Sequence, residues 1–145
     1  MNLQLLINNA SAFKKSAERS LGQRPLNESH VESFIVPAIV SLAFSIELYL
    51  KFLLAKNEIS ERSHDLSELF DKLDLITQQK IINSTGYDKN KFKLLLYKHA
   101  ETFIEWRYLH EVETDIEVNL DFMQKLASSI ESIVLLLLNN SQTKA

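Results

Sequence analysis

The sequence predicts an all-α protein, an antiparallel up-and-down bundle of four long helices with one or two short helices. Three observations favour this fold class. The 145-residue chain has only two glycines and two prolines, fewer turn residues than a β-rich protein of this length needs. Hydrophobic residues make up 46% and charged residues 24%, as in a globular domain with one buried core. Apolar residues recur at steps of three and four, the period of a helix with one buried face.

The first predicted helix spans about residues 2–20 and is amphipathic. Its apolar face is formed by Leu3, Leu6, Ala10, Phe13 and Ala17. Gly22 is the expected stop, because glycine readily adopts the left-handed conformation that ends many helices. Lys14, Lys15 and Arg19 cluster on this helix, and we interpret them as a solvated face rather than as a phosphate site.

The second predicted helix, about residues 31–57, is the most apolar segment. Between residues 34 and 55 only Glu47 and Lys51 carry a charge, and the segment approaches the roughly 20 residues of a membrane span. The two charges and Pro37 interrupt it, and no second apolar helix of that length accompanies it, so we expect no membrane contact. We interpret it as the buried centre of a bundle, with Pro37 in its first turn or at a kink.

Two short helices are expected next. Asp65 offers a side-chain acceptor at an N-cap position, and Glu68 follows three residues later, which resembles a capping box. His64, directly before this cap, is assigned to the preceding loop. A weaker helix at about residues 77–83 is expected to end before Gly86.

Two long helices are predicted in the second half of the chain, at about residues 88–111 and 119–138. The end of the second, residues 133–138, is apolar on every side and is interpreted as either core or a subunit contact. Residues 139–145 are expected to form a flexible tail. Because the sequence shows no internal repeat or low-complexity tract, residues 1–145 are interpreted as a single domain.

The first of these two long helices carries an unusual stripe of side chains. At about 100° per residue, the stripe comprises Phe92, Leu96, His99, Phe103, Trp106 and His110. His99 is interpreted as a histidine of the core or its boundary, with one hydrogen bond. His110 is the better candidate for function, because Arg107 and Glu111 lie beside it on the helix. Trp106 suits the core, although stacking on such a side chain is what single-stranded RNA needs.

Glu47 and Lys51 need partners, because a buried charge is costly unless it is paired. They are four residues apart on one helix face, so they could pair with each other. Across the bundle we expect Glu47 to pair with Arg107, since arginine offers a fixed fork to a carboxylate. This pair is either a structural ion pair or a catalytic couple, and the sequence leaves both readings open.

Composition and missing motifs narrow the chemistry. The absence of cysteine excludes disulfides, a thiolate zinc site and a cysteine nucleophile, and it suits a reducing compartment. The N-terminus lacks the basic region of a signal peptide, so we expect a cytoplasmic protein. A net charge of −3 offers no broad basic surface, so any RNA contact must be local. No phosphate loop, nucleophile elbow or His-Glu-x-x-His motif occurs, and no cofactor or metal ion is expected.

Three stretches occur in order along the chain: Ile-Glu-Leu-Tyr-Leu-Lys at residues 46–51, His-Asp-Leu at 64–66 and Trp-Arg-Tyr-Leu-His-Glu at 106–111. Together they resemble the HEPN family, the higher eukaryotes and prokaryotes nucleotide-binding domains. The resemblance runs from the second predicted helix to the last, and it implies a helical bundle that forms homodimers. Many members hold an RNA-cleaving arginine and histidine in the dimer cleft and serve as toxins or phage-defence nucleases, some beside a nucleotidyltransferase-type antitoxin. Other members lack the pair and act as binding or assembly modules.

The sequence departs from the active pattern of this family at one place. Active members separate the arginine and the histidine by four to six residues, whereas only two residues separate Arg107 from His110. On a helix the two side chains still share a side, so metal-independent RNA cleavage stays open. In that chemistry Arg107 would stabilise charge on the phosphate and His110 would act as the general acid or base.

Two functional hypotheses follow. The first is a HEPN-like homodimer of a prokaryotic defence or toxin–antitoxin system that binds RNA or a nucleotide-linked partner. Its expected polar cluster, beside the candidate catalytic Arg107 and His110, comprises Glu47, Lys51, His64, Asp65, Trp106 and Glu111. The alternative is a non-catalytic interaction module, in which the Glu47–Arg107 pair is structural and the apolar end of the last helix makes the protein contact.

Overall fold

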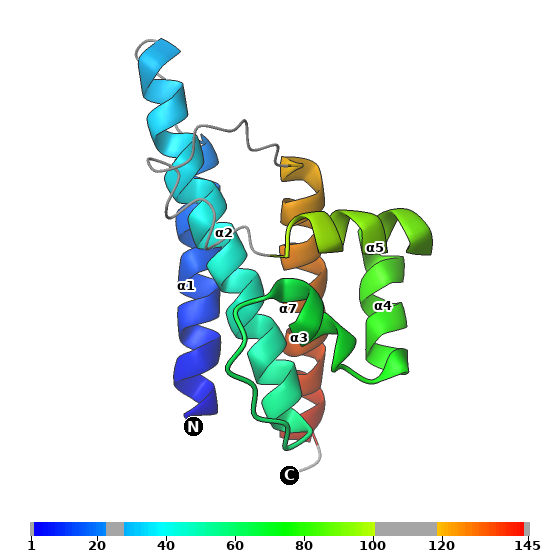
Figure 1. Cartoon of the computed structure of the whole chain (residues 1–145). Coiled ribbons are helices and arrows are strands. Elements are labelled where there is room, and N and C mark those ends of the chain that lie inside the picture. The colour runs from blue at the N-terminus through cyan, green and yellow to red at the C-terminus, as the bar shows by residue number, and fades with distance from the viewer. Residues whose placement is uncertain (1, 23–27, 101–118, 144–145) are drawn as a thin grey trace.

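The computed structural model describes residues 2–22, 28–100 and 119–143. Every regular element in these residues is a helix, which confirms the all-α fold class (Figure 1). The helices are α1 (Leu3–Gly22), α2 (Glu28–Lys56), α3 (Leu66–Asp71), α4 (Leu75–Thr85), α5 (Lys89–Lys98) and α7 (Leu120–Thr143).

The central helix is α2, against which α1, α3 and α7 pack. Figure 1 shows α1 antiparallel along one side of α2, with α7 on another side running in the same direction as α2. The shorter α3 packs on α2, while α4 packs on α7 and α5 on α3. The backbones of α1 and α2 approach closely where the Ser45 hydroxyl donates to the Ala10 carbonyl at 2.7 Å.

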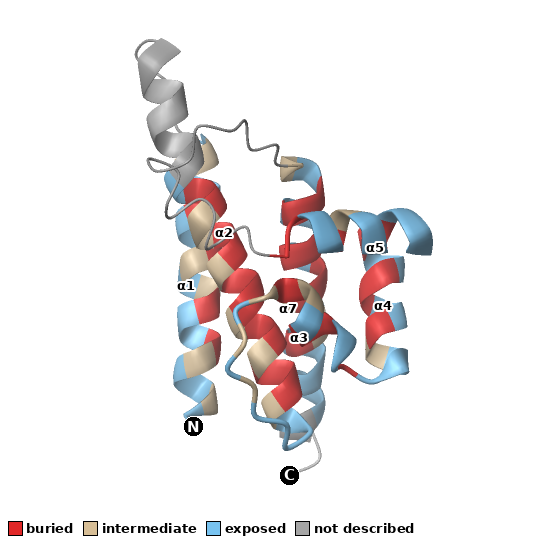
Figure 2. Ribbon diagram, viewed as in Figure 1, coloured by how far each residue is buried: buried red, intermediate tan, exposed pale blue. Residues whose placement is uncertain are grey.

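The core follows the apolar sides of these helices, and buried residues line α2 over most of its length (Figure 2). The stretch Pro37–Lys56 has the length and composition of a membrane span, but 67% of it is buried inside the fold. That burial is what the central helix of a bundle requires. Pro37 lies inside α2 and not in its first turn, because the helix begins earlier than predicted, at Glu28.

The four-long-helix arrangement is not confirmed, because the predicted helix at 88–111 is interrupted. The helix α5 ends at Lys98, and His99 and Ala100 form a turn. Neither glycine nor proline causes this end. Instead, the Ala100 carbonyl accepts a 2.8 Å hydrogen bond from the Leu66 amide at the start of α3, so a tertiary contact overrides local helix propensity.

The last helix is longer than predicted, since α7 continues past Leu138 to Thr143, through most of the segment expected to be a tail. Its apolar end, residues 133–138, is partly core and partly surface, since Val134 is fully buried whereas three leucines are exposed. Leu135, Leu136 and Leu137 are 50%, 62% and 40% exposed.

Candidate functional site

Glu47 is the most deeply buried charged residue described, with 1% of its surface exposed. It lies near the middle of α2, where its neighbours Ile46, Tyr49 and Leu50 are also buried. A carboxylate in such a position is stable only if other groups replace the water it has lost. Its partners therefore define the first candidate site.

Two side chains, Lys51 and His64, take the place of water around the Glu47 carboxylate. The Lys51 ammonium, one turn along α2, lies 3.2 Å from Glu47 Oε2. His64 Nδ1 lies 3.1 Å from Oε1 and 3.2 Å from Oε2 of the same carboxylate. We call Glu47, Lys51 and His64 the Glu47 cluster. Its side-chain exposure rises from 1% at Glu47 through 15% at Lys51 to 56% at His64, so the cluster runs from the core to the surface.

The path of the chain explains how a residue 17 positions away meets Glu47. The helix α2 ends at Lys56, and Glu58 just beyond it adopts the left-handed conformation (φ 61°). The Ile59 amide donates a hydrogen bond to the Leu54 carbonyl at 2.9 Å. This is a Schellman ending, with a glutamate at the position where glycine is usual. It reverses the chain, and the loop to α3 returns along α2 (Figure 1).

Asp65 fixes the end of this loop, as predicted. Its side chain accepts hydrogen bonds from the Ser67 and Glu68 amides and so caps α3. The other half of the predicted capping box is made indirectly. The Ser63 hydroxyl accepts from the Asp65 amide at 3.0 Å and donates to the Glu68 carboxylate at 2.6 Å. His64 is therefore held between two residues of one capping network.

The geometry also fixes the tautomer of a neutral His64. A carboxylate only accepts hydrogen bonds, so the imidazole nitrogen that faces Glu47 must carry a proton. In the neutral ring that proton is on Nδ1, and Nε2 holds a lone pair. Nothing in the described parts of the chain is hydrogen-bonded to this Nε2.

His99 has a different, structural role. It is 1% exposed; its Nδ1 donates to the Leu95 carbonyl at 2.8 Å, and its Nε2 accepts from the Asn119 amide at 2.9 Å. The predicted core position is confirmed, with two hydrogen bonds where one was expected. Ala100 and Asn119 thus both lie beside His99, and Ala100 is bonded to Leu66, two residues from His64. Residues 101–118 connect Ala100 to Asn119 in the sequence.

Four of the predicted site residues lie in that segment, residues 101–118, and so outside the described residues: Trp106, Arg107, His110 and Glu111. The expected Glu47–Arg107 pair stays a prediction for this reason. Of the other four, Glu47, Lys51 and His64 come together, whereas Asp65 adjoins His64 in the sequence and caps α3.

A second polar cluster lies between α1, α2 and α7, and the sequence analysis missed it. Lys14 is 8% exposed, which corrects its assignment to a solvated face. Its ammonium lies 2.6 Å from Glu18 and 3.2 Å from Glu131, and the Tyr49 hydroxyl donates to Glu131 at 2.7 Å. We call Lys14, Glu18, Tyr49 and Glu131 the Glu131 cluster. A signal was present, because Lys14 shares the buried face of α1 with Ala10 and Ala17.

Electrostatics in the Glu131 cluster favour the protonated forms of its two proton donors. Burial alone would lower the pKa of Lys14, but the bonds to Glu18 and Glu131 outweigh burial and raise this pKa. Burial, together with the bond to Glu131, raises the pKa of the Tyr49 hydroxyl. A cavity of about 100 Å³ adjoins the cluster and is lined partly by Lys14 and Glu18. All four side chains are paired with one another, as in a structural network.

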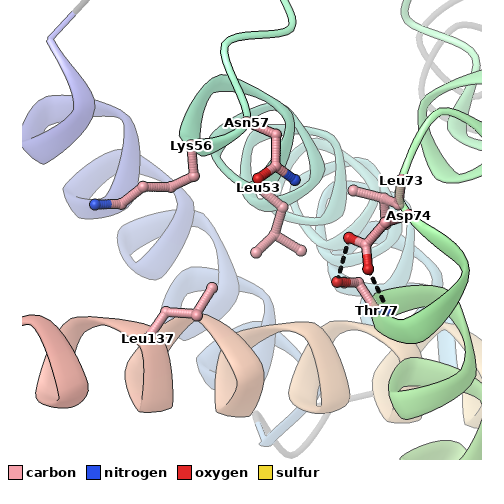
Figure 3. Close-up of a pocket in the computed structure, with 7 residues that line it drawn as sticks. All are labelled: Leu53, Lys56, Asn57, Leu73, Asp74, Thr77 and Leu137. Carbon is pink, nitrogen blue, oxygen red and sulfur yellow. Dashed lines mark hydrogen bonds between the residues drawn. The ribbon is translucent and has the colours of Figure 1, made fainter.

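The larger pocket, about 290 Å³, lies between the end of α2, the start of α4 and α7 (Figure 3). Its apolar lining includes Leu53, Leu73 and Leu137. Its one carboxylate, Asp74, accepts from the Thr77 hydroxyl at 2.6 Å and the Thr77 amide at 3.0 Å. These bonds lower the pKa of Asp74 and commit it to the cap of α4. The carboxylate of this pocket is therefore committed to a structural role, and Lys56 supplies the cationic group of its lining.

Metal ligands do not gather in the described parts of the chain, where no three His, Cys, Asp or Glu side chains lie close enough to share an ion. Comparison of the chain with family models, characterised proteins and solved structures finds no match. Any function must therefore be argued from the site itself.

Proposed function

We propose that this chain is a HEPN-like, RNA-associated protein of a prokaryotic defence or toxin–antitoxin system, and that it cleaves RNA without a metal ion as a homodimer. The observation that carries the proposal is the Glu47 cluster. A buried carboxylate holds a mostly buried ammonium and, at the surface, an exposed imidazole. Such an arrangement can both neutralise charge and move protons, the two requirements for attack on a phosphodiester.

The position of the cluster supports the same proposal. The Ala100 carbonyl accepts a hydrogen bond from the Leu66 amide, and Leu66 follows His64 by two residues. Arg107 and His110 follow Ala100 by seven and ten residues in the sequence, so the proposal predicts that they lie near the Glu47 cluster. In the proposed reaction Arg107 stabilises the charge on the phosphate, and His110 transfers a proton.

The test compares cleavage of a panel of labelled single-stranded RNAs, with chelator present, by the wild type, Arg107→Ala and His110→Ala. We expect the wild type to cut and both variants to lose activity, with helical content and oligomeric state unchanged. Lys93→Ala, an exposed lysine on α5, is the matched control and should cut like the wild type. A wild type that cuts no RNA at high protein concentration would overturn the nuclease proposal.

A second function, a non-catalytic interaction module, is favoured by the exposed leucines of α7. Leu135 and Leu136, which are 50% and 62% exposed, form an apolar patch near the end of α7, which is typical of a protein contact. The partner in this case is a second copy or a nucleotidyltransferase-type antitoxin. Leu136→Asp should abolish self-association in light scattering, whereas Leu94→Asp, at a 70% exposed leucine of α5, should not. Self-association that survives Leu136→Asp would exclude this surface as the homodimer contact.

A further inference from the structure

Metal-independent cleavage of RNA by its own 2′-hydroxyl requires two proton transfers. One group removes the proton of the 2′-hydroxyl, and another supplies a proton to the departing 5′-oxygen. Arginine stays protonated throughout and can do neither. The Arg107–His110 pair therefore provides only one of the two proton-transfer groups.

We propose that His64 is a catalytic residue of this reaction, acting as the general base, and that Glu47 is the residue that positions it. The inference rests on the proposed ribonuclease function and adds a site residue to it. It needs only side chains whose placement is described: the carboxylate, the imidazole and the neighbouring ammonium of the Glu47 cluster.

The hydrogen bond to Glu47 prepares the imidazole for this role. With Nδ1 directed at the carboxylate at 3.1 Å, a neutral ring presents its lone pair at Nε2. The His64 side chain is 56% exposed, so a substrate can approach this nitrogen. When Nε2 takes a proton, the buried carboxylate stabilises the imidazolium that forms, as an aspartate does in a serine-protease triad.

His99, the other histidine whose side chain is described, fits this role poorly. It is 1% exposed, and each of its ring nitrogens is bonded to a backbone group. A ring fixed in this way cannot reach a substrate or exchange its proton without breaking the contact between Asn119 and the end of α5. Of the two rings, only His64 combines an orienting carboxylate with an accessible nitrogen.

The reaction balances with His64 in this position. Its Nε2 takes the proton of the ribose 2′-hydroxyl while O2′ forms a bond to phosphorus. The P–O5′ bond breaks, its electron pair goes to O5′, and O5′ takes a proton from His110 or from water. The products are a 2′,3′-cyclic phosphate and a 5′-hydroxyl, and His64 then returns its proton to solvent.

A purely structural role makes a different prediction, since His64 also fastens the loop against α2. His64→Asn separates the two roles, because the asparagine amide can donate to Glu47 in place of Nδ1 but cannot take a proton. If His64 is the base, His64→Asn and His64→Ala should both slow cleavage by about 10²–10⁴-fold. Free imidazole should restore part of the rate of His64→Ala. Arg62→Ala, at an exposed residue of the same loop, should cut at the wild-type rate.

The experiment measures single-turnover cleavage of a labelled single-stranded RNA by the full chain, with chelator present, and identifies the cyclic phosphate end. Glu47→Gln should slow turnover by about tenfold or more with little change in RNA affinity, because the amide no longer fixes the tautomer. A wild type that cuts, with His64→Asn equally active, overturns the inference and leaves the ribonuclease function standing. A wild type that does not cut overturns both. Circular dichroism on each variant separates loss of the base from loss of the fold.

Discussion

Two clusters of polar and charged side chains lie on opposite faces of α2, and they differ in the elements that supply their members. Glu47 and Tyr49 are two residues apart, which places them roughly 200° apart around the helix. Each cluster is built on a carboxylate and a lysine at 3.2 Å. The Glu131 cluster draws its members from three helices, whereas the Glu47 cluster draws its third member from a loop.

This difference in origin gives the clusters different chemistry. In the Glu131 cluster the tyrosine at its centre is 2% exposed, and every member is bonded to another member. In the Glu47 cluster the loop brings an imidazole that is bonded on one side and exposed on the other. Similar ion pairs thus close a helix interface in one place and hold an exposed imidazole in the other.

The largest effect is expected from Glu47→Ala. It leaves Lys51, a mostly buried ammonium, without its carboxylate, and we expect the free energy of unfolding to fall by about 3 kcal/mol. Urea denaturation followed by circular dichroism measures this change. Glu18→Ala is the matched control in the other cluster. Because Glu18 is 53% exposed and Lys14 keeps Glu131, its cost should stay below about 1 kcal/mol. Equal losses in the free energy of unfolding for Glu47→Ala and Glu18→Ala would contradict the difference between the two clusters.

The next effect concerns Tyr49→Phe, which removes one hydroxyl and keeps the ring. The lost hydrogen bond is made to a charged group, so the expected cost is about 2 kcal/mol at neutral pH. Glu131 keeps its bond to Lys14. Urea denaturation measures the loss, and a variant as stable as the wild type would mean that this bond contributes nothing.

The same variant tests how the raised pKa values in the Glu131 cluster make stability depend on pH. A group whose pKa is raised by folding stabilises the protein below its unfolded pKa and loses that contribution as the pH rises. The pKa values of Tyr49 and Lys14 are both raised, so the wild type should lose stability above roughly pH 10. Tyr49→Phe removes the tyrosine contribution and should flatten this decline. If the free energy of unfolding fell equally with pH in the wild type and in Tyr49→Phe, the raised pKa of Tyr49 would not contribute to the decline.

The sequence predicts the local features of these two regions but not the contacts between residues that are far apart in the chain. Periodicity finds α1 and α2, and the side chain of Asp65 identifies the cap of α3, because both signals are local. Four-residue spacing gives the Glu47–Lys51 pair. Spacing cannot give the contact with His64, which depends on the path of a returning loop.

Two features that the sequence did not predict have different origins. Lys14 lies on the apolar stripe of α1, and its burial could have been predicted by counting every position of that stripe and not only the apolar ones. The end of α5 at Lys98 has no local signal, because it depends on bonds from Leu66 and Asn119, residues far away in the sequence.

The smallest effect on stability is expected from Asp65→Ala. This variant tests whether the cap of α3 holds His64 in position. Removing an N-cap costs about 1 kcal/mol, and the cap of α4 provides a control, because Asp74→Ala removes the same kind of interaction away from the cluster. Both variants should lose similar stability in urea denaturation. Only Asp65→Ala should move the imidazole resonances of His64 in NMR spectra, because Asp65 adjoins His64 in the capping network. If Asp74→Ala moved them equally, the position of His64 would depend on the whole fold and not on its own loop.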